Sequence, residues 1–251
     1  MKVYEFCFSP TGGTRKCADL LAKALGGEVC FVDLTLPKGE FPVLGLEDVA
    51  VLAVPSFGGR VPSAAARRVA ALQGGGARAV LLCVYGNRAY EDTLVELQDA
   101  ANQAGFRIVA GVAALAEHSV ARQVAAGRPD AADAARLEEF GQKIAEKLQN
   151  GSDALPALPG NRPYRKAGGA SMVPKPSGRC NGCGVCAREC PVSAIDLHDP
   201  KKVDKTACIS CMRCVALCPQ KARKINPVMH GLAGLMLKKV CAGRKECELF
   251  L

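Results

Sequence analysis

A cysteine motif that occurs twice near the end of the chain constrains its folding more than any other feature. The spacing is C-x2-C-x2-C-x3-C-P, and the second copy begins 28 residues after the first. Three cysteines at positions i, i+3 and i+6 wrap a loop around one corner of an iron–sulfur cubane, and the fourth binds the other cluster. We therefore predict two four-iron sites. Their ligands are Cys180, Cys183, Cys186 and Cys218 for one, and Cys190, Cys208, Cys211 and Cys214 for the other.

Zinc is the alternative metal for these cysteines, because C-x2-C pairs also provide the ligands of tetrahedral zinc centres. Zinc sites usually present two pairs, whereas this chain has two evenly spaced triplets, each with an added cysteine and proline. The spacing therefore favours iron–sulfur clusters. Residues 177–226, called the cysteine module below, resemble the bacterial two-cluster ferredoxins. The resemblance implies a small α+β domain with two [4Fe–4S] clusters close enough to exchange electrons.

Charge divides the chain into two parts. Residues 1–159 hold 16 Lys and Arg against 18 Asp and Glu, whereas residues 160–251 hold 17 against 6. Such a break indicates two modules with different partners. Metal clusters and a phosphate-bearing cofactor would bring negative charge of their own, which offsets part of the basic excess. We therefore expect a protein redox partner with an acidic surface, and we rank nucleic acid below it.

The sequence shows no targeting or membrane segment. Met1–Ala18 lacks the pattern of a secretory signal, and the apolar stretch Gly231–Leu237 is too short to span a bilayer. Dense cysteine runs without an export signal are typical of metal ligands in a reducing compartment. We expect a cytoplasmic protein that has no membrane partner. Cys241 and Cys247 lie outside the motif and are interpreted as free thiols.

The first 150 residues alternate apolar runs with helical patterns. Strands are predicted at residues 3–8, 28–34, 49–54, 77–84 and 107–115, each followed by a helical or loop segment. This alternation predicts an α/β domain with a doubly wound, five-stranded parallel sheet over residues 1–150. A linker rich in Pro, Gly and Ser follows at 151–176, and residues 227–251 are predicted to form a helical tail.

A loop rich in hydroxyl groups and glycine follows the first predicted strand and opens a helix. Its side chains and backbone N–H groups form a neutral cradle that suits a phosphate at a helix N-terminus. It is neither a Walker loop nor G-x-G-x-x-G, and an ordinary capped helix is the alternative. The candidate residues are Ser9, Thr11, Gly12, Gly13 and Thr14.

Two further unusual loops follow the third and fourth predicted strands, at the edge where parallel sheets bind ligands. Together the three loops resemble the flavodoxin family over residues 1–149, and the resemblance implies FMN bound through its phosphate by the first loop. It places Pro55, Ser56, Phe57, Gly58 and Gly59 along one side of the flavin ring, and Tyr85, Gly86, Asn87 and Tyr90 along the other. The chain has no Trp, so Phe57 or Tyr90 would replace it at the ring or one face would stay open. Packing of loop tips is the alternative for both residues.

The whole chain resembles the EFR1-type flavodoxin/ferredoxin fusion proteins. FMN exchanges one or two electrons and each cluster one, so the resemblance implies an electron carrier that joins FMN to two [4Fe–4S] clusters. The alternative is an oxidoreductase in which the flavin reduces a quinone or nitro compound beside Tyr90 and His118. A redox-sensing module that binds nucleic acid is a third hypothesis.

Overall fold

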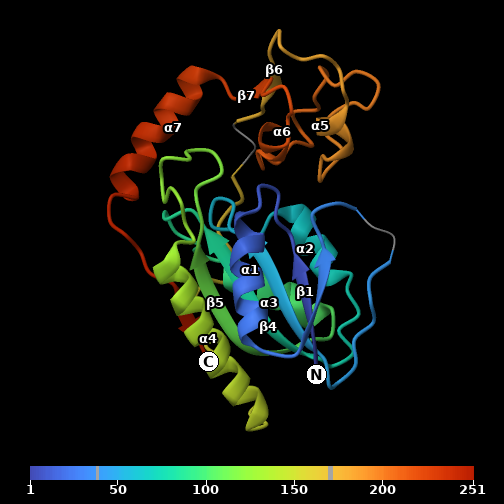
Figure 1. Cartoon of the computed structure of the whole chain (residues 1–251), viewed down its shortest axis with the longest axis vertical. Coiled ribbons are helices and arrows are strands. Elements are labelled where there is room, and N and C mark those ends of the chain that lie inside the picture. The colour runs from blue at the N-terminus through green and yellow to red at the C-terminus, as the bar shows by residue number, and fades with distance from the viewer. Residues whose placement is uncertain (38–39, 169–171) are drawn as a thin grey trace.

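The computed structural model describes residues 1–37, 40–168 and 172–251. Residues 169–171 of the expected linker therefore lie outside the described residues. Figure 1 shows a sheet domain (residues 1–150) with the cysteine module above the upper ends of its strands.

Five parallel strands form most of the central sheet, in the order β2-β1-β3-β4-β5. This is the flavodoxin-like order of doubly wound sheets, whose ligands bind at the carboxyl ends of the strands near the switch in strand order. The sequence expectation of a parallel α/β sheet is confirmed. The strands are β1 (Lys2–Cys7), β2 (Glu28–Asp33), β3 (Val49–Pro55), β4 (Arg78–Tyr85) and β5 (Arg107–Leu115).

Helices cover both faces of the sheet, which explains why β3 and β4 are nearly continuous runs of buried apolar residues. Helix α1 (Gly13–Ala24) packs against α4 (Ala131–Gln149) on one face, and α2 (Ser63–Ala70) packs against α3 (Thr93–Gln103) on the other. A capping box starts α4, because the Asp130 carboxylate accepts the N–H of Asp133, and the Asp133 carboxylate accepts that of Asp130.

The C-terminal tail differs from the helical segment that the sequence predicts. Helix α7 (Pro227–Val240) ends well before the terminus, and β8 (Glu248–Phe250) then pairs antiparallel with β5 as a sixth strand. The prediction missed β8 because three residues carry no recognisable strand period. Pairing with β8 covers part of the β5 edge, which would otherwise present unpaired N–H and C=O groups.

The cysteine module contains little regular structure, because its loops wind around two groups of cysteines. It holds two single-turn helices, α5 (Val185–Arg188) and α6 (Arg213–Ala216), and the strand β7 (Arg223–Lys224), which pairs antiparallel with β6 (Lys175–Pro176) at the end of the linker.

The linker is tied to α3 before it reaches the module. Asp92 accepts the backbone N–H of Asn161 and of Arg165, at 2.8 and 2.7 Å, and Asp99 accepts from Arg162 at 2.8–2.9 Å. None of the helices in the described parts of the chain is both long and apolar enough to cross a membrane.

Candidate functional site

A cavity of about 580 Å³ lies at the carboxyl ends of β1, β3 and β4, and it is called the composite cavity below. The structure brings most of the predicted flavin residues together there. The predicted residues that line it are Thr11, Gly13, Thr14, Pro55, Ser56, Phe57, Gly58, Tyr85 and Gly86.

The start of α1 leaves backbone N–H groups free for an anion. Gly12, which precedes the helix, has φ +91° and no side chain of its own, and the Ser9 hydroxyl accepts the N–H of Arg15, the third residue of the helix. The first turn also carries no acidic residue. Since the first N–H groups of a helix have no partner within it, those of Gly13 and Thr14 suit a phosphate at the mouth of this helix.

Ser9 makes hydrogen bonds within its loop and to Thr35. Its hydroxyl accepts the N–H of Arg15 at 2.9 Å, and its own N–H donates to Thr35 at 2.8 Å. Ser9 and Gly12 line a smaller neighbouring cavity of about 270 Å³ rather than the composite cavity. Ser9 therefore shapes the loop that presents the helix start.

The loop after β3 is a tight turn that places Phe57 on the wall of the cavity. Phe57 and Arg60 exchange two backbone hydrogen bonds of 2.9 and 3.3 Å, and the two central glycines both have positive φ. The Arg60 guanidinium is held by the carboxylate of Glu96 at 2.7 and 2.8 Å. This pairing neutralises one acidic group at the cavity and fixes the turn.

The loop after β4 divides its predicted residues between the cavity and the C-terminal segment (residues 241–250). Gly86 lies against His118, where an added Cβ would come within 2.7 Å of the ring. Asn87 is buried and instead bonds the C-terminal segment: its amide N–H₂ donates to the carbonyls of Cys241 and Gly243 at 3.0 and 2.9 Å, and its oxygen accepts from Lys245 at 3.2 Å.

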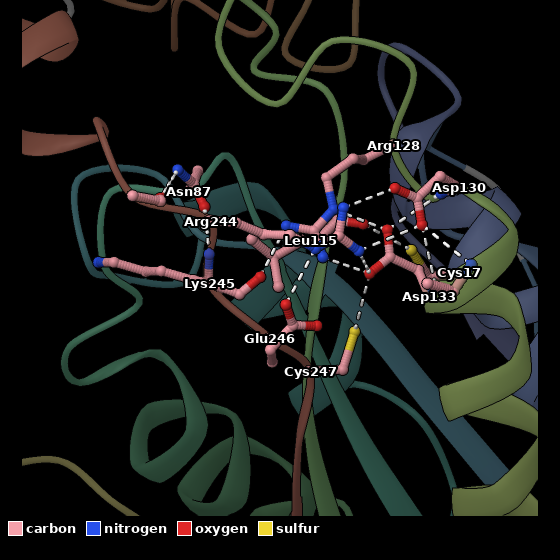
Figure 2. Close-up of polar contacts among 12 residues, drawn as sticks. Cys17, Asn87, Leu115, Arg128, Asp130, Asp133, Arg244, Lys245, Glu246 and Cys247 are labelled. Atoms are coloured by element: carbon pink, nitrogen blue, oxygen red, sulfur yellow. Dashed lines mark hydrogen bonds and ion pairs between the residues drawn. The ribbon is translucent and has the colours of Figure 1, made fainter.

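Figure 2 shows Asn87 beside this segment, which continues past Arg244 to Cys247. The Tyr90 hydroxyl likewise donates to Glu248 at 3.1 Å, and its ring packs edge-on against Tyr85. Asn87, Tyr90 and Gly59 do not line the composite cavity. The polar groups of Asn87 and Tyr90 bond a segment that the sequence analysis predicted to be helical.

His118 lines the composite cavity as a neutral imidazole. Its Nδ1 accepts the backbone N–H groups of Val120 and Ala121 at 3.2 and 3.1 Å, so Nε2 carries the hydrogen. Burial, together with the charge of Arg88, lowers the pKa of His118. The imidazole can donate one hydrogen bond from Nε2.

The cysteine module supplies a wall of the same cavity, which the sequence did not predict. Thr206, Cys208, Ile209, Ser210 and Cys211 all line it. So do Ala167, Gly168 and Met172 of the linker. The cavity is therefore built by both parts of the chain, and two predicted cluster ligands lie in its wall.

The eight predicted ligands form two groups around separate small cavities. The outer site is lined by Cys180, Cys183, Cys186 and Cys218. The junction site is lined by Cys190, Cys208, Cys211 and Cys214. Each group joins three cysteines of one motif to the fourth of the other, as the spacing predicts.

The surroundings of these sulfurs suit anionic clusters. Backbone N–H groups of Ala194 and Ala222 approach the sulfurs of Cys190 and Cys218 at 3.3 and 3.2 Å, and buried Arg223 lies 3.2 Å from the sulfur of Cys186. N–H groups directed at cluster sulfurs stabilise their negative charge. Within the described ranges, no group of Asp, Glu, His or Cys side chains converges to hold a single metal ion.

Two arginines connect the turn around Cys190 to the sheet domain. Arg213 donates to the carbonyl of Pro10 at 3.3 Å and to that of Glu189 at 3.0 Å. Arg68 donates to the carbonyl of Leu34 at 2.8 Å and to that of Pro191 at 2.5 Å. Arg213 thus links α6, beside the junction site, directly to the loop that opens α1.

Comparison with known proteins agrees with this division. Residues 179–222 match the family described as "4Fe-4S dicluster domain". The chain therefore joins a sheet of flavodoxin-like strand order to a segment that is similar to the 4Fe-4S dicluster domains.

Similar proteins cover one part of the chain at a time. Over 48 residues the chain is 46% identical to a component of the ion-translocating oxidoreductase complex of Methanosarcina acetivorans, and the match covers 19% of this chain and 18% of that protein. The chain thus spans less than a fifth of that relative. A flavodoxin of Streptococcus pneumoniae TIGR4 is 19% identical with a TM-score of 0.41, and an archaeal flavodoxin is 13% identical with a TM-score of 0.39. Each alignment covers 59% of this chain and 99% of the flavodoxin.

Proposed function

We propose that this chain is an electron-transfer protein that holds FMN in the composite cavity and a [4Fe–4S] cluster at each cysteine site. The observation that carries the proposal is the shared wall: Cys208 and Cys211 line both the junction site and the composite cavity. FMN exchanges one or two electrons, whereas each cluster exchanges one. The proposal therefore puts a two-electron site directly beside a one-electron site.

The residues of the cavity fit FMN. The N–H groups of Gly13 and Thr14 at the start of α1 suit the phosphate, and the loops after β3 and β4 bound the space beyond it. The two carboxylates at the cavity are both paired, Glu96 with Arg60 and Glu117 with Arg122. They therefore add little repulsion toward an anionic ligand.

The arrangement implies an order for electron flow. Electrons pass between the flavin and the junction site, then to the outer site, and from there to an external partner. Cys183 of the outer site is exposed, whereas Cys211 of the junction site is buried. Because Cys183 is the one exposed cysteine among the eight, we assign the exchange with a partner to the outer site.

The surface around the outer site is basic. Arg179, Arg188, Lys221 and Lys224 are exposed and lie next to its cysteines in the chain. We propose that this surface docks an acidic redox partner, because complementary charge accelerates association between proteins.

The alternative of a small-acceptor reductase has one observation in its favour, the neutral imidazole of His118 at the cavity. Tyr90, which the sequence hypothesis placed beside the acceptor, bonds Glu248 instead. Turnover of a quinone that disappears in His118→Ala but persists in Tyr90→Phe would support this second function.

Anaerobic purification with iron, sulfide and FMN quantified tests the main proposal. We expect about eight irons and one FMN per chain, in line with two four-iron clusters. Four irons, zinc, or a chain that cannot be loaded with FMN would contradict it.

The order of flow is tested with Cys211→Ala, which removes a ligand of the junction site. A reduced acidic ferredoxin, supplied as the electron donor, should then reduce the outer cluster but bleach the flavin absorption far more slowly than in the parent. Cys30→Ala, at a half-buried cysteine of β2 outside both sites, is the matched control. Equal flavin reduction in Cys211→Ala and the parent would show that electrons do not pass through the junction site.

A further inference from the structure

The two cysteine motifs are repeats of one another, yet they differ at two positions between their cysteines. Only the second motif lines the composite cavity. Aligning Cys180 with Cys208 places Gly182 opposite Ser210 and Gly184 opposite Met212. All four residues have positive φ, between +52° and +76°. Glycine adopts this conformation without strain, whereas serine and methionine do so at a conformational cost.

Packing does not explain the serine. A Cβ at Gly182 would meet no atom within 4 Å, so the outer motif keeps glycine where space is open. Ser210 lines the composite cavity, and its hydroxyl oxygen is buried without a hydrogen-bond partner among the residues that the structure describes. A buried hydroxyl without a partner is destabilising unless a ligand satisfies it.

The backbone and the side chain of Ser210 serve different sites. Its backbone N–H donates to the sulfur of Cys208 at 3.5 Å, so the loop holds a ligand of the junction site. Its side chain is left to the composite cavity, between Cys208 and Cys211. One residue therefore belongs to the walls of both sites.

From this juxtaposition we propose that Ser210 is a flavin-binding residue supplied by the cysteine module, whose hydroxyl donates a hydrogen bond to the polar edge of the bound FMN. The inference rests on the proposed function. It has a consequence for assembly: the loop takes its strained shape while wound around a cluster, so FMN binds more tightly to a chain whose junction site is filled. By reciprocity, FMN also stabilises that site.

The decisive variant is Ser210→Gly, which installs the residue of the outer motif. It removes the hydroxyl, and it removes the conformational strain of a serine at positive φ, because glycine adopts this φ easily. We expect iron and sulfide content equal to the parent and thermal stability equal or higher, because a strained serine is replaced by glycine. We expect the FMN dissociation constant to rise about tenfold, as for one lost buried hydrogen bond.

The affinity is measured anaerobically on the full chain, by equilibrium dialysis with the fluorescence of free FMN as readout. Gly182→Ser is the matched control, since it adds the same side chain at the equivalent position of the outer motif. Its FMN affinity should equal that of the parent. A parent-like dissociation constant in Ser210→Gly would overturn the inference. So would an unchanged dissociation constant accompanied by an altered electron paramagnetic resonance signal of the reduced clusters, since the hydroxyl would then serve the cluster.

Failure of the two proposals can be told apart. A parent chain that takes up no FMN overturns both. A parent that binds one FMN per chain, with Ser210→Gly binding equally well, overturns the role of Ser210 alone and leaves the electron-transfer function standing.

Discussion

Replacing Asn87 tests whether this residue holds the C-terminal segment or the flavin. Its side chain makes three hydrogen bonds to residues 241–245 and lies outside the composite cavity. Because its φ is +62°, Asn87→Gly removes the side chain and leaves a backbone conformation that glycine adopts easily. The substitution therefore isolates the hydrogen bonds from backbone strain.

The expected loss follows from those contacts. Three neutral hydrogen bonds at about 0.5–1.5 kcal/mol each give a local loss of about 2–3 kcal/mol, since solvent replaces part of them. At 1.4 kcal/mol per factor of ten, amide hydrogens of residues 243–250 should exchange roughly thirty- to a hundredfold faster. Hydrogen exchange followed by mass spectrometry on the anaerobic protein measures this directly.

FMN affinity is the discriminating readout in the same variant. We expect it to equal that of the parent, because the amide of Asn87 is committed to the segment. A weakened FMN affinity with parent-like exchange over residues 243–250 would refute the reasoning and support the sequence interpretation of Asn87 as a flavin ligand. Asn102→Ala, at an exposed position near the end of α3, is the control and should change neither quantity.

Three further predictions concern other contacts. Burial, together with the charge of Asp19, raises the pKa of Glu5 from 4.5 to about 8. Because this pKa is higher in the folded chain, the stabilisation is complete below pH 4.5 and is lost as pH rises through 8. The free energy of unfolding of Glu5→Gln should therefore exceed that of the parent by a margin that grows from pH 5 to pH 9 and reaches about a few kcal/mol. A margin that does not change with pH would contradict this. Arg213→Lys loses the contact with the Pro10 carbonyl, so amides of residues 11–14 should exchange about tenfold faster at unchanged iron content, and parent-like exchange would count against the link. Lys221→Glu should slow reduction by an acidic partner at low salt and lessen its salt dependence, whereas Lys23→Glu at the far end of α1 should do neither.

Most of the sheet domain could be predicted from the sequence. The expected strands at residues 49–54 and 107–115 are found at Val49–Pro55 and Arg107–Leu115, because buried parallel strands are runs of apolar residues that any window along the chain detects. The cavity loops were found for a related reason: the carboxyl ends of parallel strands meet at one edge, so unusual residues after β1, β3 and β4 had to lie together.

Contacts between distant segments could not be predicted in this way. Asn87 and Tyr90 follow a strand that ends at the cavity, yet their side chains bond the C-terminal segment: Asn87 bonds residues ahead of β8, and Tyr90 bonds Glu248 of β8 itself. Nothing local to residues 85–90 shows that a segment more than 150 residues later will pair there.

The doubled cysteine motif by itself indicated which eight thiols form two groups, and that the fourth cysteine of each motif joins the three of the other. The reason is geometric: a loop with cysteines at i, i+3 and i+6 surrounds one site whatever the rest of the chain does. Only the tertiary structure decided which group faces the composite cavity. The two motifs are nearly equivalent as sequences, and their difference comes from docking: Arg213 bonds Pro10, and Ser210 enters the cavity wall. Those contacts depend on how the cysteine module packs against the sheet domain, a relation that neither motif encodes alone.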